Sequence, residues 1–159
     1  MKHRTFTIDT SFELTQATTR VPPHLSPDGG MLAMSIQPHK REPEPGGNQS
    51  YTAHGVPKEM VGSRVLVIDT TTGDVEEPFP DASTSWGAQW SPDGTTLVAY
   101  VQHESQTCLA TWKREEKNYR LYPHVFVRPF FGFEVPQWTP DSQSLVVKLV
   151  ATVCRVVAI

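Results

Sequence analysis

A turn sequence that occurs three times constrains the fold of this chain more than any other feature. The copies lie at residues 26–29, 91–94 and 139–142, and they share the pattern Ser/Thr-Pro-Asp-Gly/Ser. Proline sets φ for the first central position of a type I turn, aspartate hydrogen-bonds to its local backbone, and glycine accepts a positive φ. Each copy therefore predicts a tight hairpin between antiparallel strands. The residues expected to build these turns are Pro27, Asp28, Gly29, Pro92, Asp93, Gly94, Pro140 and Asp141.

The sequence around each turn also repeats. An apolar run follows every copy, and a tryptophan precedes the second and third copies, at Trp90 and Trp138. The third copy has Ser142 where the other two have glycine, and a non-glycine residue at positive φ costs on the order of 1 kcal/mol. Repetition of short strands joined by Pro/Gly turns is typical of the blades of a β-propeller.

We therefore predict an all-β fold, a partial β-propeller of about three blades. Each blade is an antiparallel four-stranded sheet, and the last is incomplete. The expected organisation is an N-terminal leader at 1–19, blade one at 20–80, blade two at 81–124 and an incomplete blade three at 125–159. Blade one includes a long insertion at 37–63, whose many prolines and glycines predict a loop that contributes nothing to a core. Three blades cannot close a ring, so the open blade faces predict self-association or a longer parent protein.

Composition excludes several classes of partner. The 159 residues carry a net charge of −3, which gives no basic footprint for nucleic acid or an anionic membrane. The chain has no apolar run long enough to span a bilayer, and its first residues do not resemble a secretory signal, which favours a cytoplasmic location. Cys108 and Cys154 fall in expected strands and are interpreted as small buried hydrophobic residues. No cofactor is expected.

The aromatic-Ser-Pro-Asp-Gly hairpin followed by an apolar strand resembles the TolB-like, WD-type propeller repeat, over residues 20–150. The order of the first blade, the insertion, the segment Val-Ile-Asp-Thr-Thr-Thr-Gly and the second Trp-Ser-Pro-Asp-Gly further resembles the start of prolyl oligopeptidase-like serine peptidases. In that family the propeller covers a C-terminal α/β-hydrolase domain. The resemblance implies a domain that gates or orients peptide substrates for such a hydrolase.

The catalytic part of that family is absent from this chain. No Gly-x-Ser-x-Gly nucleophile elbow occurs in the sequence. The six histidines lie in expected loops, termini or strand ends, with neither triad order nor metal-ligand spacing. We therefore expect no catalytic residue and no metal site in the chain, while the parent protein would be a serine peptidase.

Candidate binding residues follow from the topology of a four-stranded meander. Connections between strands 2 and 3 and between successive blades share one rim, so the insertion 37–63 and the link 123–134 should lie together. Loops on a rigid scaffold commonly carry binding residues, and the candidates here are Arg128, Phe130, Phe131, Glu42 and Glu44. For the phenylalanines, packing between blades two and three is the alternative interpretation.

Two functions remain open after this reasoning. The chain is either the gating propeller of a prolyl oligopeptidase-like hydrolase or a non-enzymatic TolB-like scaffold that binds protein. The partners expected are therefore a C-terminal hydrolase domain in the same parent chain or a separate protein or peptide. The discriminating feature is a nucleophile elbow downstream of residue 159.

Overall fold

Three antiparallel sheets make up the computed structural model of the chain. The structure describes residues 15–18, 20–38, 51–52, 56–104, 106–128 and 134–150, and the backbone of 154–158. Every sheet is built from strands that pair antiparallel, and the second is a four-stranded meander. No helix in these ranges is long and apolar enough to cross a membrane. The all-β, partial propeller architecture expected from the repeated turns is therefore confirmed.

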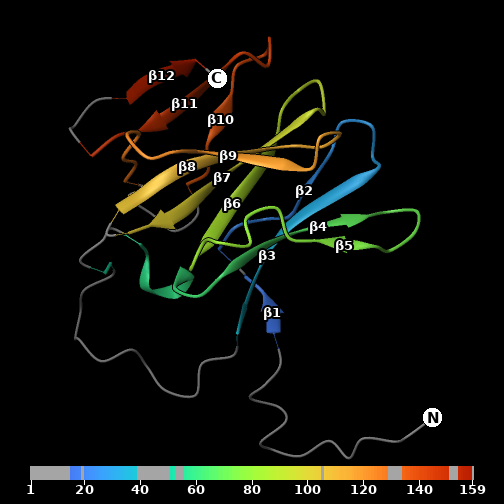
Figure 1. The fold of residues 1–159 in the computed structure, drawn as a ribbon, viewed down its shortest axis with the longest axis horizontal. Helices are drawn as coiled ribbons and strands as arrows, with labels where there is room; N and C mark the ends of the chain where they lie inside the picture. The colour runs from blue at the N-terminus through green and yellow to red at the C-terminus, as the bar shows by residue number, and fades with distance from the viewer. Residues whose placement is uncertain are drawn as a thin grey trace, which may run out of the picture.

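The strands follow the chain from one sheet to the next (Figure 1). The first sheet contains β1 (Thr15–Ala17), β2 (His24–Leu25), β3 (Met31–Pro38), β4 (Arg64–Asp69) and β5 (Val75–Glu76). The second contains β6 (Ser85–Trp90), β7 (Thr96–His103), β8 (Gln106–Lys113) and β9 (Asn118–Tyr122). The third contains β10 (Gln137–Trp138), β11 (Ser144–Lys148) and β12 (Cys154–Ala158), three strands within the described residues.

The second sheet lies between the other two and buries both of its faces (Figure 1). Side chains alternate along a strand, so Leu97 and Ala99 of β7 pack toward the first sheet. Val98 and Tyr100 face the opposite way and pack with Leu145 of β11. Burial of a leucine side chain is worth about 1.5–3 kcal/mol, and a sheet buried on both sides is a rigid support for whatever its loops and outer strands carry.

The three repeated turns have the same hydrogen-bond pattern. In the second copy, Ser91 Oγ donates to Asp93 Oδ1 at 2.6 Å, and Asp93 Oδ1 also accepts the N–H of Thr95 at 3.0 Å. The N–H of Thr96 donates to Ser91 Oγ at 3.0 Å, which ties the start of β7 to the turn. The equivalent bonds are present around Asp28 and Asp141. Hairpins are thus present at all three predicted positions, with positive φ at Gly29, Gly94 and Ser142.

Successive sheets are joined along their inner strands by side chains. The N–H of Trp90 in β6 donates to His24 Nδ1 in β2 at 2.9 Å. Trp138 Nε1 in β10 donates to the carbonyl of Gln89 in β6 at 3.0 Å. Each step from one sheet to the next therefore has at least one side-chain-to-backbone bond near the start of its hairpin.

Two segments differ from the sequence expectation. The prediction that the insertion 37–63 contributes nothing to a core is wrong, because Val56, Met60 and Ser63 are fully buried. A 3-10 helix at Lys58–Met60 brings Met60 into the cluster between the second and third sheets. In the expected leader, β1 pairs with the end of β3, while β2 pairs with its beginning. The short strands β1 and β2 therefore lie on the same side of β3, one after the other along its length.

Candidate functional site

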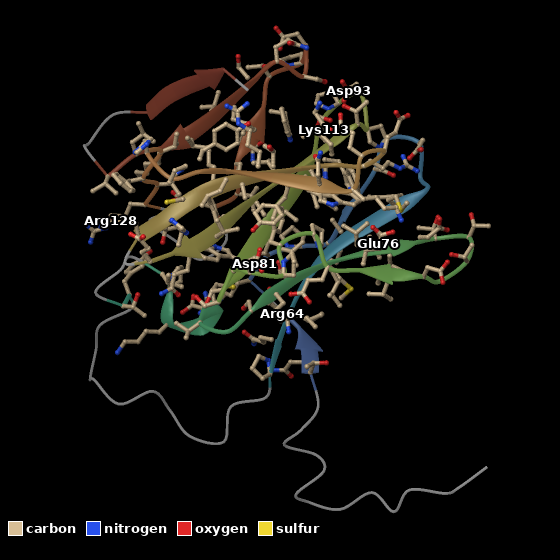
Figure 2. All side chains as sticks on the ribbon, viewed as in Figure 1. Arg64, Glu76, Asp81, Asp93, Lys113 and Arg128 are labelled. Carbon is tan, nitrogen blue, oxygen red and sulfur yellow. The ribbon has the colours of Figure 1, made fainter. Side chains whose placement is uncertain are left out.

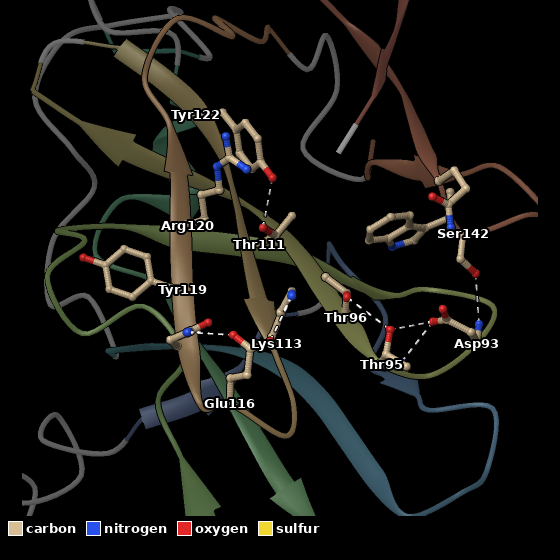
Figure 3. Close-up of a pocket in the computed structure, with 13 residues that line it drawn as sticks. Asp93, Thr95, Thr96, Thr111, Lys113, Glu116, Tyr119, Arg120, Tyr122 and Ser142 are labelled. Carbon is tan, nitrogen blue, oxygen red and sulfur yellow. Dashed lines mark hydrogen bonds and ion pairs between the residues drawn. The ribbon is translucent and has the colours of Figure 1, made fainter.

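A groove of about 650 Å³ opens between the second and third sheets, on the rim that carries the repeated turns (Figure 3). One wall is the outer half of the second sheet, with Thr111, Lys113, Asn118, Arg120 and Tyr122. The other wall comes from β10 and the turn that follows it, with Trp138, Ser142 and Gln143.

Strand register explains how the second-sheet wall is built. Residues directly opposite each other on neighbouring antiparallel strands lie on the same face. Three cross-strand rows therefore face the third sheet, namely Thr96–Lys113–Asn118, Val98–Thr111–Arg120 and Tyr100–Leu109–Tyr122. The first row is polar and lies nearest the turns, whereas Tyr100 and Leu109 of the last row are buried. The lining of the groove is therefore mostly polar, with Trp138 and Tyr122 among its aromatic groups.

Arg120 is held in a defined orientation within this wall. Its guanidinium carbon lies 5.1 Å from the centre of the Tyr122 ring, a distance at which a cation is attracted to an aromatic face. The Tyr122 hydroxyl is in turn hydrogen-bonded to Thr111 Oγ1 at 3.3 Å. Figure 3 shows the three side chains together on one side of β9. A guanidinium fixed in this way offers planar, paired donors to a carboxylate.

The other charged groups of the groove already have partners. Lys113 Nζ donates to Glu116 Oε1 at 2.9 Å, and Asn118 Nδ2 donates to the second carboxylate oxygen at the same distance. The hydrogen bond from Lys113 is the main reason that the pKa of Glu116 lies below its usual range. Likewise, the bond from the Ser91 hydroxyl is the largest cause of the lowered pKa of Asp93. Both carboxylates are therefore ionised at neutral pH.

The opposite side of β9 is partly covered by β5 and the segment that follows it, and Tyr119 there keeps 39% of its surface exposed. Tyr119 also lines the groove, but in Figure 3 its ring lies on the other side of β9 from Arg120, and its hydroxyl donates a hydrogen bond to Asp81 Oδ2 at 2.6 Å. That bond to a carboxylate raises the pKa of the Tyr119 hydroxyl, because the neutral phenol is the donor. The Tyr119 ring also packs edge-on against Phe79, with centroids 6.1 Å apart. β9 thus has one partly covered face and one face that borders the groove.

The groove has the chemistry of a binding site. It supplies hydroxyls, an amide, an indole ring and a guanidinium, which can orient a ligand through hydrogen bonds and an ion pair. Within the described ranges, no group of three or more His, Cys, Asp or Glu side chains is arranged to hold a metal ion. The hydroxyl of Thr95, which also lines the groove, donates a hydrogen bond to Asp93 Oδ1 at 2.9 Å within the turn.

The sequence-based binding candidates lie elsewhere or outside the described ranges. Arg128 is exposed on the far side of the molecule from Asp93 and Lys113 (Figure 2). Its N–H donates to the carbonyl of Lys148 at 3.0 Å, beside exposed Phe126. The other four candidates, Phe130, Phe131, Glu42 and Glu44, are not among the described residues. The structure therefore does not test this set of five residues, and they stay predictions.

Sequence reasoning missed the groove residues themselves. The signal in the sequence was the alternation at 118–122, where Asn118, Arg120 and Tyr122 share one face. That pattern does not say which face meets another sheet and which borders open space, so it could not single out Arg120.

No family model matches the chain, and no curated protein matches it. Solved structures resemble it in fold: TolB from Acinetobacter baumannii (12% identity, TM-score 0.49), the AtxE2 isopeptidase (18%, 0.47) and a protein described as TolB from Agrobacterium tumefaciens (18%, 0.45). These matches cover 84%, 84% and 85% of this chain, but only 28%, 21% and 53% of the other chains. The chain therefore spans well under two thirds of their lengths.

Proposed function

We propose that this chain is a protein-binding scaffold that holds an extended polypeptide segment in the groove between its second and third sheets. The observation that carries the proposal is the second-sheet wall of the groove. There the oriented guanidinium of Arg120 and the hydroxyls of Thr96 and Thr111 lie on a sheet that is buried on both faces. Ligand sites combine an apolar surface with a few placed polar groups. The rings of Trp138 and Tyr122 supply the apolar surface, while Thr111, Asn118 and Arg120 supply the polar groups.

Selection of peptides from a random displayed library tests the proposal. We expect the wild-type chain to enrich peptides whose binding is lost in Asn118→Trp, because an indole at this position fills the polar opening of the groove. A matched control is Arg64→Gln, which removes an exposed ion pair with Glu77 on the first sheet. The control should retain binding. Enriched peptides that bind the Asn118→Trp variant as well as wild type, or no enrichment at all, would reject the groove as the binding site.

A second function is the gating role in a longer protein. In this form the blades at 20–80, 81–124 and 125–159 would be the start of a propeller that admits peptides to a C-terminal hydrolase. The feature that favours it is the rim opposite the repeated turns, where Arg128 lies beside exposed Phe126 and Val150. Such a rim, with the predicted residues Glu42, Glu44, Phe130 and Phe131, would face the hydrolase.

The open reading frame downstream of residue 159 tests this second function. A Gly-x-Ser-x-Gly motif between a strand and a helix would support a hydrolase partner in the same chain. Further Ser-Pro-Asp-Gly repeats followed by a stop codon would favour the scaffold alone.

A further inference from the structure

We propose that the segment bound in the groove is acidic, and that a carboxylate side chain of this extended segment pairs with Arg120. This inference rests on the proposed protein-binding function and names the class of partner. It is carried by three features of the β8–β9 hairpin: the pairing of its basic residues, the way its other face is covered, and the groups around Arg120.

The hairpin carries four basic side chains, and three of them form ion pairs with carboxylates. The pairs are Lys113–Glu116, Arg114–Asp28 and Lys117–Glu76. Arg120 is the fourth, and within the described part of the chain its charged group has only the Tyr122 ring as a partner. A carboxylate from a ligand would complete the pattern of the hairpin without displacing an existing pair.

The covered face of β9 indicates what kind of segment fits such a surface. There the first sheet places the short strand β5 and the residues after it against the hairpin (Figure 2). This segment supplies Glu76 to Lys117 and Asp81 to the Tyr119 hydroxyl, and Phe79 to the Tyr119 ring. On this side of β9, the chain itself thus binds an extended acidic segment that includes an aromatic residue. The groove presents the equivalent side-chain chemistry, a cation and a tyrosine, on the other side.

The surroundings of Arg120 suit a carboxylate on an extended chain. The hydroxyls of Thr96 and Thr111 lie in the same wall and can bond to peptide groups of the ligand. Orientation by Tyr122 reduces the side-chain freedom that Arg120 loses on binding, which lowers the entropic cost of the ion pair. Because the groove is open to solvent, the contribution of the pair should weaken as salt is added.

Two synthetic peptides of identical length test the inference: acetyl-Thr-Val-Thr-Glu-Val-Thr-amide and its counterpart with glutamine in place of glutamate. Affinities are measured by NMR titration, following the Arg120 Nε–H and Trp138 indole N–H signals. We expect the glutamate peptide to bind the wild-type chain up to about fivefold more tightly than the glutamine peptide, which is the range for an ion pair that stays open to solvent. In Arg120→Gln this preference should vanish, and in Arg120→Lys part of it should remain. Arg64→Gln, the matched control, should keep the full preference.

The outcomes separate the inference from the function beneath it. Equal binding of both peptides, with shifts of the groove signals, would overturn the acidic preference and leave the scaffold function standing. A preference for glutamate that persists in Arg120→Gln would assign the selectivity to another residue and also overturn the inference. If neither peptide binds, the acidic inference fails, and the library selection above decides whether the groove binds peptides at all. Because Arg120 is exposed, we expect its variants to melt at the same temperature as the wild-type chain. Unchanged melting shows that a change in peptide binding does not come from altered folding.

Discussion

The backbone N–H of Asp93 donates a hydrogen bond to Ser142 Oγ at 3.1 Å. Ser142 is the residue that replaces glycine in the third repeated turn, and it has a φ of 61°. The Cβ of Ser142 makes this turn less favourable for the backbone, and the hydroxyl that it carries bonds the second turn to the third. The first two turns are also in contact, because Gly94 of the second turn lies against the Pro27 ring of the first.

Substitution of Ser142 separates these two effects. Ser142→Ala keeps the positive φ and loses the bond, so it should destabilise the chain by about 1 kcal/mol. Ser142→Gly loses the same bond but removes a backbone cost of similar size, and its stability should lie close to wild type. Chemical denaturation gives the two free energies of unfolding. If the alanine variant is as stable as the glycine variant, backbone strain at Ser142 is not significant.

Glycine is required at residue 94 for two reasons that a pair of variants distinguishes. Gly94 and Gly73 have φ values of 73° and 79°, and valine at positive φ is strongly disfavoured. A Cβ at Gly94 would lie 3.4 Å from Pro27 Cδ, whereas one at Gly73 would meet nothing within 4 Å. Both Gly94→Val and Gly73→Val should therefore lower the free energy of unfolding by about 1–2 kcal/mol or more, and the melting temperature with it. Gly94→Val should be the worse of the two, and an equal loss would exclude a role for the Pro27 contact.

Acid should weaken the three turns together. Hydrogen bonds from the turn hydroxyls are the largest cause of the lowered pKa values of Asp28, Asp93 and Asp141. A carboxyl whose folded pKa lies below its unfolded value of 3.8 stabilises the fold above that pH. The free energy of unfolding should thus fall as the pH drops below about 4. In Asp93→Asn the fall should be shallower, since the amide oxygen accepts bonds without titrating. An identical acid dependence in the variant would show that Asp93 does not contribute.

The chain should not react as a serine hydrolase. Its sequence contains no Gly-x-Ser-x-Gly nucleophile elbow. Incubation with a fluorophosphonate probe should leave the purified protein unlabelled under conditions that fully label a known serine hydrolase. Stoichiometric labelling of one residue would contradict this expectation.

Self-association is expected through the outward face of the third sheet. In β11, Leu145 and Val147 are buried toward the second sheet, and Val146 faces the other way with 39% of its surface exposed. Light scattering should give a mass that rises with protein concentration, and Val146→Lys should reduce the rise. Val75→Lys, at an exposed position of β5, is the matched control and should behave as wild type. A constant monomer mass for the wild-type chain would contradict the prediction.

The parts of the fold that could be predicted are those decided by local chemistry. Proline, aspartate and glycine in sequence specify a turn through their own torsions and bonds, so the hairpins at Asp28, Asp93 and Asp141 follow from the sequence alone. Burial of Val56 and Met60 could not be predicted in the same way. Their segment is rich in turn-forming residues, and only its docking beside Trp86 and Tyr100 makes it part of a core.

The groove is harder still to derive, because it depends on the relation between two sheets. The alternation at 118–122 separates Arg120 from Tyr119, but both residues look like ordinary strand surface. Their different surroundings arise because the first sheet covers one face of β9 as far as Glu76 and Asp81, and the third sheet does not. Within the described residues, Arg120 is the basic side chain of the β8–β9 hairpin that has no carboxylate partner, and this follows from the packing of the sheets.

The bond between Trp90 and His24 has a consequence for the order in which the molecule comes apart in acid. His24 accepts this bond at Nδ1, so it must be neutral there, and burial lowers its pKa from 6.5. The unfolded chain therefore binds this proton first, and the seam between the first and second sheets begins to weaken as the pH falls below about 6.5. The turn carboxylates respond only below about 4. Mild acid thus acts on the contact between the first and second sheets at a pH where the carboxylates of the three turns are still ionised.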